Sequence, residues 1–328
     1  MKRRAFLAGI GAALMSPVVV SAQQTDATRR IGFLANFRSD DSEGQVRIDS
    51  FNRVLQQLGW REGANLHTEI RWPGDDVGLS RQYAQELVDL KPDVILAWAT
   101  PSVSALQRLT RSIPIVFANV IDPVGAGYVV SMAHPGGNTT GFTAFEYSIS
   151  GKWLELLKEL APALVRVAVV RDPSIASGIG QFAAIQAFAS STSLELTAID
   201  PADESAIDRA FASVASQPNG GVIVTASSVA LAHRDHLIAA AMRYRLPAIY
   251  PFPYFAPLGG LAAYGPDAAD VAARAAAYVD RILRGERPAD LPVQAPTRYQ
   301  LAINVKTAKA LGITVSPSLL IRADDAIE

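Results

Sequence analysis

The stretch Asp-Val-Ile-Leu-Ala-Trp-Ala-Thr-Pro-Ser at residues 93–102 is the clearest structural signal in this chain. It begins with a nearly continuous apolar run, which is typical of a strand buried on both faces of a parallel sheet. It then changes at once to Thr100, which can cap a helix, and Pro101, which suits a first helical turn. A buried strand that leads directly into a helix is the repeating unit of α/β proteins.

The same unit recurs in both halves of the chain, and stretches with helical spacing separate the copies. The apolar runs are residues 30–36, 93–100 and 113–119 in the first half, and 166–172, 221–227 and 246–250 in the second. Strands that alternate with helices predict parallel sheets covered on both faces. Ligands of such sheets bind beyond the carboxyl ends of the strands. We therefore expect an α/β fold with two Rossmann-like lobes and a ligand cleft between them.

Composition narrows the classes of protein and of chemistry. The chain has 328 residues, enough for two domains, with 49% hydrophobic and 19% charged residues and a formal net charge of −1. No basic stripe is present, which argues against nucleic acid as a partner. The sequence contains no cysteine, so disulfides, thiol nucleophiles and thiolate metal sites are excluded.

The N-terminus has the pattern of a signal peptide. Basic residues 2–4 precede the apolar stretch 5–20, and Ala22 ends a plausible cleavage site. Residues 3–7 also resemble a twin-arginine signal, so the Sec and twin-arginine routes both stay open. The apolar stretch is short for a membrane span, and a chain without cysteine cannot be a lipoprotein. We expect residues 1–22 to be removed and the mature protein to be soluble and periplasmic.

Several further elements are expected from local pattern. The alanine-rich stretch 267–283 predicts a strong helix, and apolar spacing predicts one helix over 229–244. Asp122 and the proline after it predict a short helix, by the same cap-then-proline pattern as at Thr100. Beyond residue 311 we expect only a short tail.

Four motifs together resemble one bacterial family. They are Ala-Thr-Pro-Ser at 99–102, the run 117–127, Gly-Gly-Asn-Thr-Thr-Gly at 136–141, and the run 301–312. In this order they resemble the ABC-transporter substrate-binding proteins that include tryptophan- and tyrosine-binding members. The resemblance covers almost the whole mature chain. It implies a type I periplasmic-binding-protein fold, in which the chain crosses between the lobes more than once.

The resemblance also implies how the chain divides between the lobes. We expect residues 29–143 with about 265–290 in the first lobe, and 144–264 with about 298–328 in the second. The helix at 267–283 should thus pack on the first lobe. Opening and closing is expected about hinges near 143–145 and 261–265.

Two motifs depart from the members that bind aromatic amino acids. Those members carry Thr-Asp-Asn where this chain has Thr-Ala-Ser-Ser at 225–228, and Asp-Tyr-Tyr where this chain has Gly-Pro-Asp-Ala at 265–268. The acidic and amide side chains of the first motif and the tyrosines of the second are therefore missing.

The first candidate ligand-binding residues follow the buried strand at 93–99. They are Thr100, Pro101 and Ser102, at the start of the next helix. A helix start would present free backbone N–H groups and the positive end of the helix dipole to a ligand carboxylate, and the Thr100 and Ser102 hydroxyls would add donors. A plain helix cap is the alternative, and the resemblance favours the binding role. Asp122 also follows a strand, either as a cap or as a partner for a ligand ammonium, a role for which Asp267 is the other candidate.

Further candidates lie at other strand ends. Asn36 and Phe37 end the first strand, and we interpret the polar loop after them, residues 38–44, as a solvated connection. The remaining candidates are Ser227 and the aromatic residues Tyr250, Phe252 and Tyr264, which would line the cleft, whereas Trp98 is expected in the core.

Catalysis finds little support in the sequence. No Walker loop or Gly-x-Ser-x-Gly elbow is present, and His233 and His236 are expected on a solvated helix face rather than at a metal. We therefore expect no cofactor and no metal. The favoured function is a monomeric solute-binding component of an ABC importer, with a small carboxylate-bearing ligand and an inner-membrane permease as partners. An exported sensing module for a membrane receptor, or a two-domain α/β enzyme, is the alternative.

Overall fold

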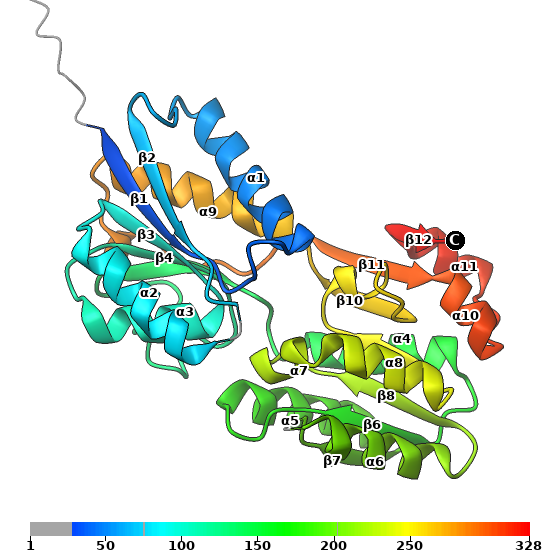
Figure 1. The fold of residues 1–328 in the computed structure, drawn as a ribbon. Helices are drawn as coiled ribbons and strands as arrows, with labels where there is room; N and C mark the ends of the chain where they lie inside the picture. The colour runs from blue at the N-terminus through cyan, green and yellow to red at the C-terminus, as the bar shows by residue number, and fades with distance from the viewer. Residues whose placement is uncertain (1–27, 75, 202) are drawn as a thin grey trace, which may run out of the picture.

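The computed structural model describes residues 28–328 except Asp75 and Ala202, so the expected signal peptide lies outside the described residues. Two sheets, each with helices on both faces, form two lobes (Figure 1). This confirms the expected α/β fold. Within the described residues, no helix is both long enough and apolar enough to cross a membrane.

The first sheet is entirely parallel. Its strands are β1 (Arg29–Leu34), β2 (Leu66–Arg71), β3 (Val94–Trp98), β4 (Ile115–Val120) and β5 (Thr139–Thr143), in the spatial order β2-β1-β3-β4-β5. All five residues of β3 are buried, as its continuous apolar sequence predicts.

In the described part of the chain, four helices cover this sheet, two on each face. They are α1 (Ser42–Gln57) and α9 (Ala268–Leu283) on one face, and α2 (Val77–Asp89) and α3 (Ala99–Leu109) on the other. The orange α9 lies beside the blue α1 in Figure 1, although residues 58–267 separate the two helices in the sequence. Its buried alanines, Ala272, Ala275 and Ala276, allow that close approach. The helix expected at 267–283 therefore packs in the first lobe.

The second sheet is mostly parallel. It contains β6 (Arg166–Val170), β7 (Glu195–Ile199), β8 (Gly220–Val224), β9 (Ala248–Tyr250), β10 (Ala262–Pro266), β11 (Tyr299–Asn304) and β12 (Asp325–Ile327), in the order β12-β11-β10-β9-β8-β6-β7. The pair β10 and β11 is antiparallel, unlike the parallel pairing expected from the alternation of strands and helices. Antiparallel neighbours need no crossover helix, and here the chain enters β11 directly from the first lobe.

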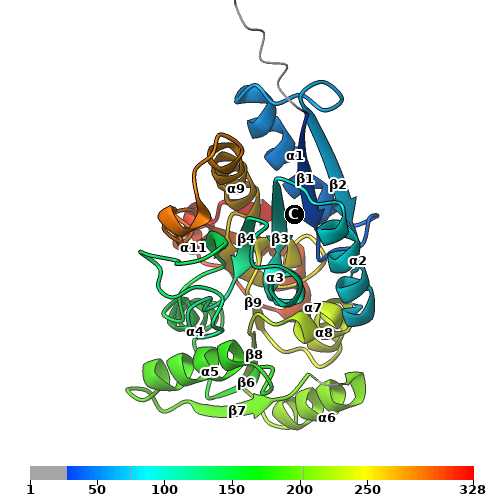
Figure 2. The same cartoon turned by 90° about the vertical axis from the view of Figure 1, so that its left-hand side faces the viewer.

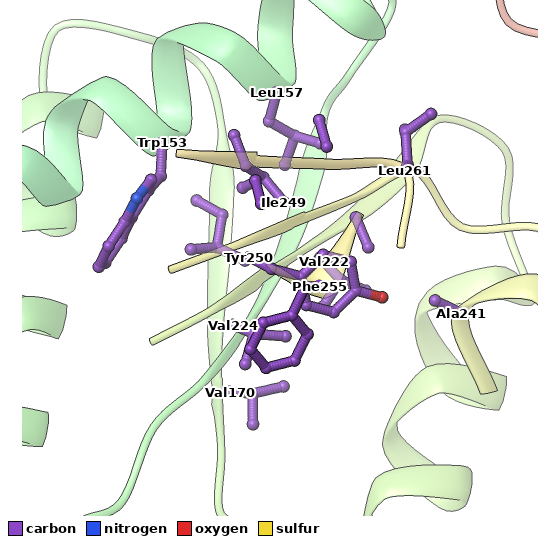
Figure 3. Packing of buried hydrophobic residues seen from close by; sticks show 14 of the residues in the cluster. Trp153, Leu157, Val170, Val222, Val224, Ala241, Ile249, Tyr250, Phe255 and Leu261 are labelled. Carbon is purple, nitrogen blue, oxygen red and sulfur yellow. The ribbon is translucent and has the colours of Figure 1, made fainter. Parts of the chain in front are cut away.

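Helices also cover both faces of the second sheet. They are α4 (Ile149–Leu160), α5 (Ala176–Ala189), α6 (Glu204–Ala215), α7 (Ser228–Ala232), α8 (Arg234–Arg243), α10 (Val305–Leu311) and α11 (Pro317–Arg322), with the 3-10 helix η1 (Pro253–Phe255). Figure 3 shows the core that they enclose, where Tyr250 and Phe255 stack at 4.8 Å between centroids. Trp153, also in this core, donates from Nε1 to the carbonyl of Tyr264 at 2.7 Å.

The chain passes between the lobes at three places. It leaves the first lobe after β5, returns between β10 and α9, and leaves again after the 3-10 helix η2 (Pro288–Asp290) to enter β11. Backbone hydrogen bonds tie these segments together, from Thr143 N to Gln294 O at 2.9 Å and from Asp267 N to Arg298 O at 3.1 Å. Figure 2 shows the lobes from the side, one above the other. Motion about these segments stays a prediction.

Three local expectations are wrong. Residues 123–127 form turns instead of a helix, because Asp122 Oδ1 accepts from Gly125 N at 2.8 Å and two glycines follow, which disfavour helix. The helix expected over 229–244 is divided at His233 into α7 and α8. The tail is not irregular: it forms α11 and β12, and β12 extends the second sheet beside β11.

Candidate functional site

Two adjacent cavities lie between the lobes, beyond the carboxyl ends of the strands. One, here called the polar cavity, has a volume of about 290 Å³, and the other, the apolar cavity, has about 470 Å³. Ala99 and Asn119 of the first lobe and Leu231 and Phe252 of the second line both cavities. A cleft at this edge of the sheets is where α/β proteins bind ligands.

Strained backbone surrounds this cleft. Ala99 (φ 65°), Asn119 (φ 60°) and Asp122 (φ 48°) all occupy the left-handed region, which non-glycine residues rarely adopt. All three line the apolar cavity and lie at or just beyond the ends of β3 and β4. Such strain persists where the surrounding structure enforces it, and it is concentrated at binding sites.

The start of α3 faces the apolar cavity. The helix begins at Ala99 with Trp98 as its N-cap residue and without a side-chain cap, so Thr100 is not the cap that the sequence predicts. The left-handed backbone at Ala99 changes the chain direction between β3 and α3. Because α3 begins immediately after β3, no hydroxyl-bearing residue occupies the N-cap position. Thr100 and Pro101 line the apolar cavity, whereas Ser102 is fully buried and lines neither cavity.

Asp122 lines the apolar cavity and also joins the lobes. Its Oδ1 holds the Gly125 turn, while its Oδ2 accepts from the hydroxyl of Tyr147 in the second lobe at 3.1 Å. Burial, and then the Asp122 charge, raise the pKa of Tyr147 to about 12, so this hydroxyl keeps its proton. Both Asp122 oxygens therefore accept hydrogen bonds in this arrangement.

The second lobe adds polar groups to the same cavity. Ser227 lines it and caps α7, with its Oγ accepting from Ala230 N at 3.0 Å. Asp172, which the sequence analysis did not select, is buried there and accepts from Ser174 N at 2.8 Å and Oγ at 2.6 Å. The signal for Asp172 was an acidic residue two positions after the end of the apolar strand at 166–170.

Of the three aromatic candidates, Phe252 lies at the cleft. Its ring stacks on that of Tyr254 at 5.8 Å and lines both cavities. Tyr250 lies in the core of the second lobe (Figure 3), and Tyr264 stacks on Tyr299 at 5.8 Å away from both cavities. Side chains alternate between the faces of a strand, so a place near a strand end does not by itself direct an aromatic ring into the cleft.

Asp267 acts as the N-cap of α9. Its Oδ1 accepts from the backbone N–H groups of Ala269 and Asp270, and its Oδ2 accepts from Gln300 Nε2 at 3.2 Å. It lines neither the polar nor the apolar cavity. It lines a third cavity of about 320 Å³, here called the side cavity.

Residues that follow the end of β1, and residues of the next loop, line the polar cavity. Asn36 and Phe37 line it as expected at a cleft, and Phe37 packs against Trp98 at 5.7 Å between centroids. Trp98 is buried, as expected for a core residue, and it also forms part of the cavity wall.

The loop at 38–44 is more than a solvated connection, because Asp41 reaches the other lobe. Its Oδ2 accepts from Arg234 Nη1 of α8 at 3.2 Å, and its Oδ1 caps α1 at Glu43 N at 3.0 Å. The two partners of this ion pair lie far apart in sequence, so local pattern gives no sign of it.

Arg47 of α1 is the second residue that the sequence analysis missed. Its side chain is only 5% exposed and lies against three rings: Phe37 at 4.8 Å, and Trp98 and Tyr254 at 5.5 Å each. Burial lowers the pKa of this guanidinium from its usual value. The available sequence signal was that Arg47, a charged residue, lies on the apolar face of an amphipathic helix.

The two histidines do not lie on a solvated face. His236 is largely buried, with Nε2 3.3 Å from Asp208 Oδ1 and Nδ1 3.5 Å from Glu204 Oε2, both on α6. His233 also approaches Glu204, at 3.9 Å. Among residues 28–328 apart from 75 and 202, no group of three or more His, Asp or Glu side chains could hold a metal ion.

Two α/β lobes with ligand-sized cavities between them define a periplasmic-binding-protein-like fold. The chain belongs to the ABC transporter substrate binding protein family, which matches residues 36–327. Its members are substrate-binding proteins of ABC transporters and not enzymes, and they act outside the cytoplasmic membrane.

Individual relatives agree with this family. The chain is 27% identical over 267 residues to a tyrosine-binding protein of Clostridioides difficile (strain R20291), covering 80% of this chain and 75% of the relative. It is similar in structure to a conserved domain protein of Vibrio cholerae, with a TM-score of 0.83, 26% identity, and coverage of 91% and 99%. It also shares its fold with an ABC domain in complex with L-Trp from Streptococcus pneumonia, with a TM-score of 0.83, 22% identity, and coverage of 92% and 100%.

Proposed function

We propose that this protein captures a small carboxylate-bearing ligand, an aromatic amino acid or a related aromatic acid, and delivers it to an ABC permease in the inner membrane. The observation that carries the proposal is the start of α3, which opens onto an interlobe cavity large enough for such a ligand. The tyrosine-binding relative and the structural neighbour with L-Trp support the aromatic class.

In this proposal the ligand carboxylate lies at the start of α3. There the free N–H groups of the first turn and the positive end of the helix dipole stabilise an anion, and the Thr100 hydroxyl adds a donor. The ring of the ligand packs against Phe252 of the opposite lobe. A ligand ammonium has Asp122 and Asp172 as acceptors, because both carboxylates line the same cavity.

The test is Thr100→Val, measured by calorimetry with L-tyrosine and L-tryptophan. A hydrogen bond to a charged group contributes about 1.5–3 kcal/mol, so affinity should fall by roughly tenfold or more. Thr314→Val changes an exposed threonine far from the cleft and should leave affinity unchanged. Equal affinity of the Thr100 variant would remove Thr100 from the site, and a wild type that binds neither amino acid, nor any aromatic acid, would refute the proposed ligand class.

The location belongs to the same proposal. We expect export to the periplasm as a monomer after removal of residues 1–22, in keeping with a family that acts outside the membrane. N-terminal sequencing of the periplasmic protein should begin at Gln23. Material that begins at Met1 would contradict this.

A further inference from the structure

Arg47 holds a buried positive charge whose donors are incompletely used. Its Nη2 lies 3.5 Å from Glu43 Oε2, which is long for a strong hydrogen bond. Its Nε and Nη1 are buried and have no hydrogen-bond partner among the residues that the structure describes. A buried charged group normally has its hydrogen bonds satisfied, and leaving them open is unfavourable.

The aromatic rings around Arg47 do not replace those hydrogen bonds. Phe37, Trp98 and Tyr254 contact the guanidinium through cation–π interactions, which stabilise its charge but leave its N–H groups without acceptors. Glu43 is partly exposed, so its carboxylate is shared with solvent. An additional anion would complete the set of partners.

The position of Arg47 ties it to the cleft. It lines both the polar cavity and the side cavity. Phe37 and Trp98 belong to the first lobe and Tyr254 to the second, so the enclosure is complete only when the lobes meet. Opening would move Tyr254 away and expose the guanidinium to an incoming ligand.

We propose that Arg47 binds a second carboxylate of the ligand, at the end that enters the polar cavity. This rests on the proposed function, which gives the first carboxylate to the start of α3 in the apolar cavity. The two cavities are adjacent, since Ala99, Asn119, Leu231 and Phe252 line both, and we place one ligand across this shared border. The class of ligand is therefore an aromatic compound with acidic groups at both ends. A guanidinium suits the second one because its planar donors match a carboxylate.

Two probes with the same ring separate this inference from the proposed function. The monoacid is 3-phenylpropanoate, and the diacid is 4-(2-carboxyethyl)benzoate, which adds a carboxylate at the far end of the ring. Calorimetry on the wild type should give at least tenfold tighter binding of the diacid. Arg47→Met should abolish this preference, because charge-assisted hydrogen bonds to the second carboxylate are lost. The ratio of the two affinities is the readout, since any change in lobe closure affects both acids alike.

Matched variants control for folding. Arg53→Met changes an exposed arginine on the same helix and should leave the preference intact. Arg47→Lys keeps the charge but loses the planar donors, and should reduce the preference. It serves as the test if Arg47→Met does not fold.

The outcomes distinguish the two ideas. A wild type that binds both acids equally overturns the role of Arg47 and leaves the proposed function standing. So does a preference that survives in Arg47→Met or is undiminished in Arg47→Lys. A wild type that binds neither acid, nor any amino acid of the first test, overturns both.

Discussion

The ion pair between Asp41 and Arg234 should hold the lobes in the closed arrangement. Asp41→Asn is the sharpest perturbation, because asparagine keeps the oxygen that caps α1 while it removes the charge that binds Arg234. The variant therefore changes the contact between the lobes and leaves the start of the helix intact.

The size of the effect follows from burial. The side chains of Asp41 and Arg234 are 13% and 31% exposed, which places the pair between surface pairs of about 0–1 kcal/mol and buried pairs of about 3–5 kcal/mol. A loss of about 1–2 kcal/mol lowers the closed-to-open ratio by roughly 5–30-fold. Where the open form predominates without ligand and only the closed form holds the ligand, affinity falls by the same factor.

Calorimetry with the ligand measures the fall in affinity. Small-angle scattering of the ligand-free protein measures the change in population where the closed form is populated without ligand. Arg234→Gln should weaken binding as Asp41→Asn does, and the double variant should lose little more than either single one. Asp40→Asn is the control, because Asp40 is 69% exposed and pairs with its neighbour Arg38. Unchanged scattering and affinity in Asp41→Asn, or losses that add fully in the double variant, would refute this reasoning.

Three further substitutions test other parts of the structure. Gly141→Ala places a Cβ about 2.0 Å from the carbonyl oxygen of Phe117, in a backbone conformation (φ 153°) that disfavours side chains. Urea denaturation should therefore show a free energy of unfolding lower by several kcal/mol, or the variant should not fold. Tyr147→Phe removes the hydrogen bond to Asp122 and should weaken ligand binding a few-fold by calorimetry, without a change in circular dichroism. Asn304→Ala removes the cap of α10 and a buried bond to Ala256 O, and should lower the free energy of unfolding by about 1.5–3 kcal/mol in denaturant titrations.

The parts of the fold that local sequence encodes were predictable. The continuous apolar run of β3 and the alanine-rich α9 both form as expected, since burial on both faces and helix propensity are read directly from neighbouring residues. The antiparallel direction of β11 and the addition of β12 depend on where the chain re-enters the second lobe. The hydrophobic periodicity of these strands does not indicate their direction or their place in the sheet.

The site was less predictable for the same reason. Asn36 and Phe252 lie on cavity walls because they follow strands, which is a topological rule. Tyr250 follows that rule equally well and still points into the core, since the rule does not fix side-chain direction. Arg47 is recognised as a site residue because rings from both lobes surround it. Those contacts are visible only in the folded structure.

The packing of α9 beside α1 sets an order for synthesis on the ribosome. The first lobe receives its strands and α1 early, yet the part of the sheet that α9 covers, over β3, β4 and β5, stays exposed until residue 283 has been translated. Through most of translation the nascent chain thus carries a sheet with exposed core residues such as Leu96 of β3 and Val116 of β4, a state prone to aggregation. Because α9 is translated late, we expect the nascent chain to bind chaperones. The first lobe is completed only when most of the sequence has been synthesised.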